Sequence, residues 1–462
     1  MFLRLKLPLH SILPMRKPLP WAWVATMSLG LLLGGCANLN REKSPDTVEQ
    51  QLSQARWWND FHDPLLADLI AQAMRANPSI LSSQAALLQA RALRDVKLAA
   101  TRPNLTVSGS VQRNAADGAE ASVNFRGGLD ASWELDVFGA KNSALANSEA
   151  ELQAAGANLR DMQLSMTAEV ALAYIQLRGL QEQLTIARQN LGSQQETLQI
   201  TQWRAQAGLV TSLEVEQAQN AVSQTAAQIP ALQSSLGKTR HSLAVLTGQR
   251  PHELDALLTT ALPVPQVAAQ VADVIPADSL RQRADVRAAE ARITAALASV
   301  DAAEAALLPS FRLGGSVGLT ALTLAGFSNG AALATQILAS VSVPVLDGGA
   351  SKAQVRAQKA VLAQANASYQ NTLLTALKDV EDALIALRYD RERLSHLQQA
   401  ASAAENAALL AQNRYNSGLI DFQTVLQTQR TLLSAQDSVA SQQAALSNDH
   451  VRLIKAMGGG WQ

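Results

Sequence analysis

The sequence has few aromatic residues and no excess charge of either sign. Aromatic residues make up 4% of the 462 residues, and 38 lysines and arginines balance 38 aspartates and glutamates. A balanced charge without a basic patch excludes a surface built to bind nucleic acid. Abundant alanine, glutamine, leucine and serine favour closely packed helices over a bulky globular core.

Sequence motifs of enzyme active sites are also missing. The six histidines have no metal-ligand spacing, and there is no nucleophile elbow, phosphate loop or cysteine-based motif. The acidic residues Asp130, Glu134 and Asp136 alternate along one predicted strand. A polar strand face that lines a water-filled space explains them better than catalysis does. We therefore expect a protein that is not an enzyme and that holds no metal or cofactor.

Long apolar runs are absent beyond the N-terminal region. Basic residues precede an apolar run from Trp21 to Leu33, which is too short to span a membrane stably and is followed at once by polar sequence. This pattern predicts a secretory signal peptide at residues 1–35. No apolar run of twenty residues occurs later in the chain.

The apolar run ends in "LGGC", so the chain's one cysteine, Cys36, directly follows two small residues. This ending resembles a bacterial lipobox. The resemblance implies that Cys36 carries a covalent lipid and becomes the first residue of the mature protein; a buried, inert thiol is the alternative. Because Ala37 follows, rather than the aspartate of lipoproteins retained at the inner membrane, the resemblance implies the outer membrane.

The mature sequence is internally duplicated. The stretch "RAQAGLVTSLEVEQAQ" around Gly208 recurs as "RYNSGLIDFQTVLQTQ" around Gly418, at an offset of 418 − 208 = 210 residues. Each half is predicted to run helix, two strands, long helix, turn, helix. The predicted divisions are a lipidated segment at 36–64, a first repeat at 65–262, a connector at 263–277, a second repeat at 278–457 and a tail at 458–462.

The helical segments carry the seven-residue spacing of packed, supercoiled helices. Apolar residues recur at this interval after the first turn and, 210 residues later, after the second: Val222, Ile229, Leu236, Leu243, Leu432, Val439, Leu446 and Leu453. The stretches before the turns, about 65 residues each, would measure roughly 100 Å as single helices. We therefore expect them to be subdivided.

Four other segments alternate between apolar and polar residues with a period of two. Strands are expected at about 104–114, 121–137, 310–322 and 333–345. One apolar and one polar face fit an ordinary antiparallel sheet on a core or, in an exported lipoprotein, a membrane barrel. Since four strands cannot close a barrel, other copies of the chain would supply the rest.

Together with the stretch "WWNDFHDPLLADLIAQAMRANPSI" from Trp57, these features resemble the TolC-type outer membrane factors, in particular the OprM-like (NodT) lipoprotein branch. The resemblance covers essentially the whole mature chain. It implies a mainly α fold, in which long coiled helices form a periplasmic α-barrel, plus four strands per protomer of a trimeric, twelve-stranded β-barrel. The repeated turns become hairpin tips, where Gly208, Leu209, Gly418 and Leu419 contact a periplasmic adaptor.

The resemblance also assigns roles around the second turn. Gln423, Thr424 and Gln427 fall where the family narrows the closed tunnel. Because Gln427 replaces the usual aspartate, an uncharged aperture is expected in place of a ring of negative charge.

A hairpin latch is implied in the same region. Tyr415 and Glu214 fall where the family bonds a tyrosine to an acidic residue and so holds neighbouring hairpins shut. The arginine that some members use beside them is Ile420 here. The alternative is that Tyr415 merely packs and Glu214 is solvated.

We therefore predict a passive exit duct of a tripartite efflux system, lipid-anchored in the cell outer membrane and extending into the periplasm. The implied partners are two further copies in a homotrimer, outer-membrane lipid, a periplasmic adaptor and an inner-membrane transporter of the RND type. Two alternatives remain open. One is an exit duct for secreted proteins, and the other is a trimeric structural lipoprotein without a conducting lumen.

Overall fold

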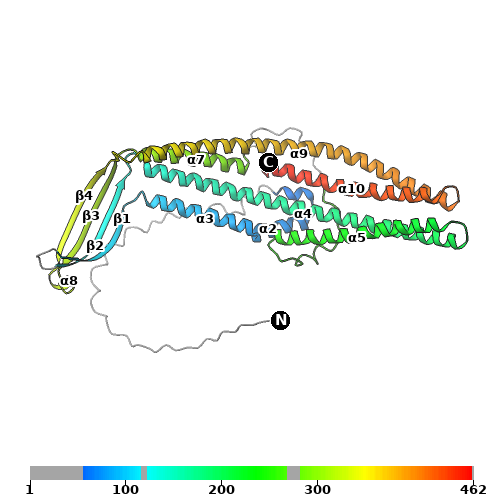
Figure 1. The fold of residues 1–462 in the computed structure, drawn as a ribbon, viewed down its shortest axis with the longest axis horizontal. Helices are drawn as coiled ribbons and strands as arrows, with labels where there is room; N and C mark the ends of the chain where they lie inside the picture. The colour runs from blue at the N-terminus through cyan, green and yellow to red at the C-terminus, as the bar shows by residue number, and fades with distance from the viewer. Residues whose placement is uncertain (1–55, 116–121, 268–280, 460–462) are drawn as a thin grey trace, which may run out of the picture. The chain divides into compact units, whose positions relative to one another are not determined.

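A computed structural model describes residues 56–115, 122–267 and 281–459 (Figure 1). The first half contains, in order, the 3-10 helix η1 (Trp57–Phe61), α2 (Pro64–Ala76), α3 (Pro78–Ala99), β1 (Asn104–Asn114), β2 (Ser122–Leu135), α4 (Ala140–Gln206) and α5 (Ser212–Leu246). The second half contains α7 (Ala284–Ala305), β3 (Ser310–Ala321), α8 (Gly326–Asn329), β4 (Ala332–Ser342), α9 (Ala350–Asn416) and α10 (Phe422–Ala456). The predicted signal peptide and Cys36 lie outside the described residues.

The predicted duplication is confirmed by the lengths of the helices. Helices α4 and α9 have 67 residues each, α5 and α10 have 35 each, and α3 and α7 have 22 each. Each half therefore runs helix, two strands, long helix, turn, helix, as the sequence indicates. In the second half, the single helical turn α8 lies between the two strands.

The prediction that the long helices are subdivided is wrong. Both α4 and α9 run without a break, which at the usual rise per residue is about 100 Å. Neither segment contains a proline, the residue that most often interrupts a helix. Since α4 follows β2 and ends at the first turn, the sheet and the turn lie at opposite ends of this helix (Figure 1).

The helices pack through the predicted apolar stripes. Leu243 of α5 and Leu453 of α10 are fully buried, and none of the other stripe residues is exposed. Helix α4 is central, because it contacts α3, α5, α7 and α10.

A buried polar chain fixes the N-terminal segment to α4. The Tyr174 hydroxyl donates to Asp63 Oδ2 at 2.6 Å and accepts from Arg178 Nη2 at 2.9 Å. Arg178 is completely buried and also donates to Thr260 O at 2.8 Å. One side of α4 therefore holds both the start of α2 and the segment that follows α5.

The strands form one antiparallel sheet in the order β1-β2-β3-β4. Register places polar side chains in a row across all four strands: Thr106, Asp130, Ser316 and Gln336. An apolar row on the other face contains Val107, Leu129 and Val317. Val107 is 83% exposed, so in the single chain this apolar face has no core against it. The alternation predicted from the sequence is thus confirmed.

The strand ends differ slightly from the prediction. Strand β4 ends at Ser342 rather than at residue 345, because Pro344 has no N–H to donate to a ladder. Strand β2 ends at Leu135 rather than at residue 137, because the chain turns there towards α4: the Asp136 carboxylate accepts from Lys141 N at 3.0 Å and from Asn142 N at 2.7 Å, in the first turn of that helix.

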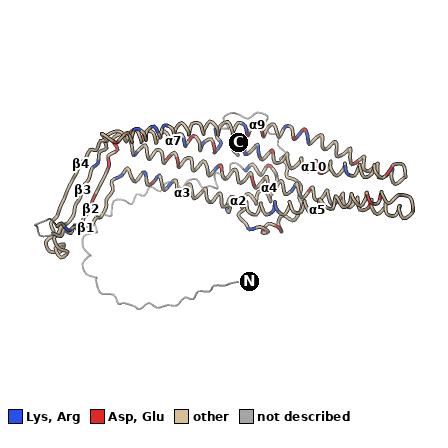
Figure 2. The backbone as a smooth tube through the Cα atoms, in the orientation of Figure 1, with Lys and Arg blue, Asp and Glu red and all other residues tan. Residues whose placement is uncertain are grey.

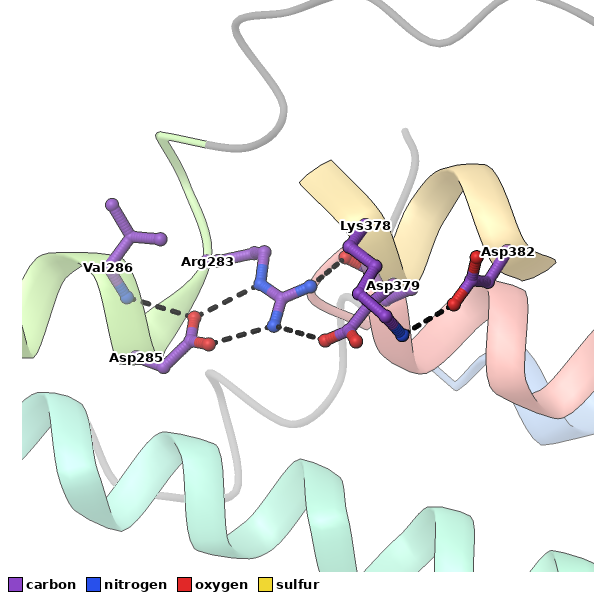
Figure 3. Close-up of polar contacts among 7 residues, drawn as sticks. Arg283, Asp285, Val286, Lys378, Asp379 and Asp382 are labelled. Carbon is purple, nitrogen blue, oxygen red and sulfur yellow. Dashed lines mark hydrogen bonds and ion pairs between the residues drawn. The ribbon is translucent and has the colours of Figure 1, made fainter. Parts of the chain in front are cut away.

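Arg283, directly before α7, joins three helices (Figure 3). Its guanidinium donates to the carbonyl of Ala456 at the end of α10 at 2.7 Å and to Asp285 of α7 at 2.8 and 3.1 Å. A longer contact of 3.3 Å reaches Asp379 of α9. The start of α7 is thereby tied to the second hairpin.

Charged residues of both signs are interspersed along the helices (Figure 2). Within the described residues, no helix is both long enough and apolar enough to cross a membrane. The same residues include no group of three or more histidine, cysteine, aspartate or glutamate side chains arranged to hold a metal ion.

Candidate gate at the paired helical hairpins

The two predicted hairpin turns have the same backbone geometry. Gly208 and Gly418 adopt φ values of 73° and 72°, in the left-handed region that favours glycine. In both turns the next residue, Leu209 or Leu419, donates its N–H to the carbonyl five residues earlier, at 2.8 and 2.9 Å. This is the Schellman ending of a helix. Both leucines are 74% exposed, so each tip presents its leucine to the surroundings.

The helices that follow the turns begin with different caps. At the start of α5, Glu214 reaches back to accept from Thr211 N at 2.7 Å in a capping box. At the start of α10, Asp421 accepts from Thr424 N at 2.8 Å and from the Thr424 hydroxyl at 2.5 Å. These hydrogen bonds from Thr424 hold the pKa of the Asp421 carboxyl below its usual range.

The predicted aperture residues lie on the exposed surface of the first turns of α10. Gln423 and Gln427 are exposed and one helical turn apart, so they share a face of the helix. Thr424 is exposed too, but its hydroxyl is bound to Asp421. Of the three predicted aperture residues, Gln423 and Gln427 therefore have the side chains that could narrow a pore. A ring of these amides would need further chains.

The predicted latch is not formed within the chain. Glu214 is engaged in the cap of α5, and the buried Tyr415 hydroxyl has no hydrogen-bond partner among the described residues. The Tyr415 side chain is 4% exposed and packs against Phe422, with ring centroids 5.5 Å apart. The alternative, in which Tyr415 packs, describes the single chain; a Tyr415–Glu214 bond between protomers stays a prediction.

Arg204 joins the hairpins instead, although no motif in the sequence indicates this role. From the last turn of α4 it donates to the carbonyls of Tyr415 at 3.2 Å and Asn416 at 3.1 Å. Its guanidinium carbon lies 4.4 Å from the centroid of the Tyr415 ring. The only sequence signal was its recurrence as Arg414, four residues before the second glycine.

Further contacts hold the first hairpin against the second. An apolar cluster is drawn from α5, α9 and α10: Ala218, Ala221, Ala411, Tyr415, Phe422, Val425 and Leu426. Helices α4 and α10 also share amide hydrogen bonds, from Asn190 to Gln436 at 2.9 Å and from Gln429 to Thr197 at 3.0 Å. Neutral polar contacts of this kind can separate without leaving an unpaired charge.

The acidic residues in and just after β2 have structural partners. Glu134 lies 3.5 Å from both Lys141 and Arg312, Asp130 accepts a hydrogen bond from the Ser108 hydroxyl, and Asp136 accepts from N–H groups in the first turn of α4. These contacts engage two of the carboxylates in the sheet and the third at the start of α4.

The duplicated hairpins, with a two-faced sheet at the opposite end of the long helices, are typical of a class of outer membrane proteins. The family described as outer membrane efflux protein matches residues 69–249 and 275–459. The chain belongs to this family.

Individual relatives and structures are similar over nearly the whole chain. Nodulation protein T of Rhizobium leguminosarum bv. viciae is 32% identical over 455 residues, which cover 95% of this chain and 93% of the relative. The pyoverdine export outer membrane protein OpmQ of Pseudomonas putida is 32% identical over 430 residues, covering 89% and 90%. The solved structure of the outer-membrane channel OprN superimposes with a TM-score of 0.84 at 36% identity, over 88% of this chain and 93% of that one.

These similarities confirm the predicted family, the mainly helical fold with a four-stranded sheet per chain, and the location in the outer membrane. They also confirm the predicted function at the level of an efflux channel of the outer membrane. The matched proteins are channels rather than enzymes.

Proposed function

We propose that three copies of this chain form the passive exit duct of a tripartite efflux pump, anchored by a lipid on Cys36. The observation that carries the proposal is the sheet. Its polar row suits a water-filled lumen, and its exposed apolar row suits contact with lipid. Four strands are too few to close a barrel, so strands from two further copies complete it.

The hairpin tips form the opposite end of the duct. The equivalent exposed residues Leu209 and Leu419 offer six similar apolar contacts per trimer to a periplasmic adaptor. Gln423 and Gln427 then surround the aperture, which is narrowed by uncharged amides. Opening moves the second-half hairpin, α9 and α10, away from the axis.

The transported substrates are small organic molecules delivered by an inner-membrane transporter of the RND type. The names of relatives refer to export of pyoverdine and to efflux of toluene and solvents, which favours small molecules over secreted proteins. The duct itself performs no catalysis and needs no cofactor.

Two measurements test this proposal. The purified mature protein should conduct ions in planar lipid bilayers, whereas a structural spacer would give no channels. A deletion strain should become more susceptible to antibiotics or solvents and should recover when the gene is returned. Unchanged susceptibility together with loss of a secreted protein would instead identify a secretion duct.

A further inference from the structure

One side chain at the end of the first hairpin makes three contacts with the end of the second. We infer that Arg204 is the clamp that keeps the duct closed, an inference that rests on the proposed function. Arg204 holds α9 at three points: the carbonyls of Tyr415 and Asn416, and the face of the Tyr415 ring.

The end of α9 is suited to receive this cation. The last carbonyls of a helix lack donors within the helix and carry partial negative charge. The planar guanidinium of Arg204 reaches two of these carbonyls at once, while the buried tyrosine ring provides a flat face with negative potential. A lysine, with a compact ammonium group, could not make all three contacts.

The internal duplication shows that the arginine comes from the first repeat and the ring from the second, and not the reverse. Adding 210 to the number of Arg204 gives Arg414, which is exposed, and subtracting 210 from that of Tyr415 gives Ala205. The equivalent reverse contact, from Arg414 to a ring at position 205, therefore cannot form. Each chain has one clamp, and a trimer has three.

The clamp does not depend on the tyrosine hydroxyl. That hydroxyl is buried without a partner in the described residues, whereas the ring face and the backbone carbonyl of Tyr415 are both engaged. Outward movement of the second hairpin must break all three Arg204 contacts. It would also uncover the cluster formed by Tyr415 and Phe422.

The first experiment measures channel opening of the full-length trimer in planar lipid bilayers. Arg204→Ala should raise the open probability by about tenfold or more, the factor expected from losing one charge-assisted hydrogen bond. Arg204→Lys should give an intermediate value. Arg414→Ala is the matched control, because it removes the equivalent arginine of the other repeat, and it should leave opening unchanged. Equal opening of Arg204→Ala and Arg414→Ala would overturn the inference.

The second experiment does not require conduction. Spin labels at positions 209 and 419, introduced as cysteines in a Cys36→Ser background, report the separation of the two tips by pulsed electron paramagnetic resonance. Arg204→Ala should lengthen and broaden this distance, whereas Arg414→Ala should not. An unchanged distance would refute the clamp even if the channel conducts. Absence of conduction in every form, with the distance change present, would refute the duct and keep the clamp.

Discussion

A buried carboxyl of α10 that faces a half-buried carboxyl of α9 should make the stability of the second hairpin depend on pH. The Asp449 side chain is 2% exposed; its Oδ1 accepts from Arg452 at 3.0 Å, and its Oδ2 has no hydrogen-bond partner among the described residues. Burial and the neighbouring carboxyl of Asp390 raise the pKa of Asp449 to about 6. A proton shared with Asp390 would satisfy the unpartnered oxygen.

The direction in which stability changes with pH follows from the pKa of Asp449 in the folded and the unfolded chain. Asp449 titrates near its ordinary value of 3.8 when unfolded and near 6 when folded, so the folded chain binds the extra proton between these values. The stabilising contribution of the protonated Asp449 is therefore fully present below about pH 4 and is lost as the pH rises through 6. A difference of about two pKa units corresponds to about 3 kcal/mol per chain. The ion pair with Arg452 lowers the pKa of Asp449 and is already included in this difference.

Asp449→Asn tests this reasoning because it removes the charge and keeps the shape. The variant should exceed the wild type in stability above pH 7 by up to about 3 kcal/mol, and this advantage should fall to about 1 kcal/mol at pH 4.5. His450 acts in the opposite direction over the same range, because burial lowers its pKa. The difference between variant and wild type is thus the quantity to measure.

Thermal unfolding followed by circular dichroism, at fixed protein concentration from pH 4.5 to 8, gives this difference. Asp382→Asn is the control, since Asp382 is exposed and, among the described residues, pairs only with Lys378 on the same helix; its effect should stay small at every pH. A stability difference for Asp449→Asn that does not vary with pH would refute the shared proton.

Three further predictions concern the duct. Gln427→Asp should place three carboxylates around the aperture and shift the reversal potential in a salt gradient towards cation selectivity; an identical reversal potential would remove Gln427 from the narrowest ring. Leu209→Asp combined with Leu419→Asp should weaken binding of the purified adaptor at least about tenfold without changing helix content, because both side chains are 74% exposed; unchanged affinity would move the adaptor site away from the tips. Cys36→Ala should abolish incorporation of labelled palmitate, and continued labelling would exclude Cys36 as the lipid attachment site.

The fold was predictable from the sequence where one physical rule acts over a long stretch. The period of two in 104–114 and the period of seven after Gly208 each place apolar residues on one face of an element, again and again. Both types of element were therefore identified correctly. The unbroken lengths of α4 and α9 were not predicted correctly. The two helices were expected to be subdivided because ordinary domains are shorter than such helices. In these segments the absence of proline was the better guide.

The site was predictable only in part, because its contacts depend on how distant segments pack. The turn glycines and exposed leucines follow from the local sequence. By contrast, Arg204 and Tyr415 are separated by 211 residues, and no local pattern indicates that a helix end of one repeat meets an arginine of the other. Glu214 had a nearer partner in the cap of its own helix, which the spacing from Thr211 to Glu214 already permitted.

The two hairpins must be alike where they bind an adaptor and different where they contact each other. An adaptor that binds six tips in a ring needs the same surface at each, and the two turns meet this demand with equal φ values and equally exposed leucines. A clamp between neighbouring hairpins has a donor side and an acceptor side, so the two repeats must differ there, as Arg204 with Tyr415 and Arg414 with Ala205 do. Restoring symmetry with Ala205→Tyr would therefore alter the gate, whereas exchanging the two tip sequences would leave the adaptor surface unchanged.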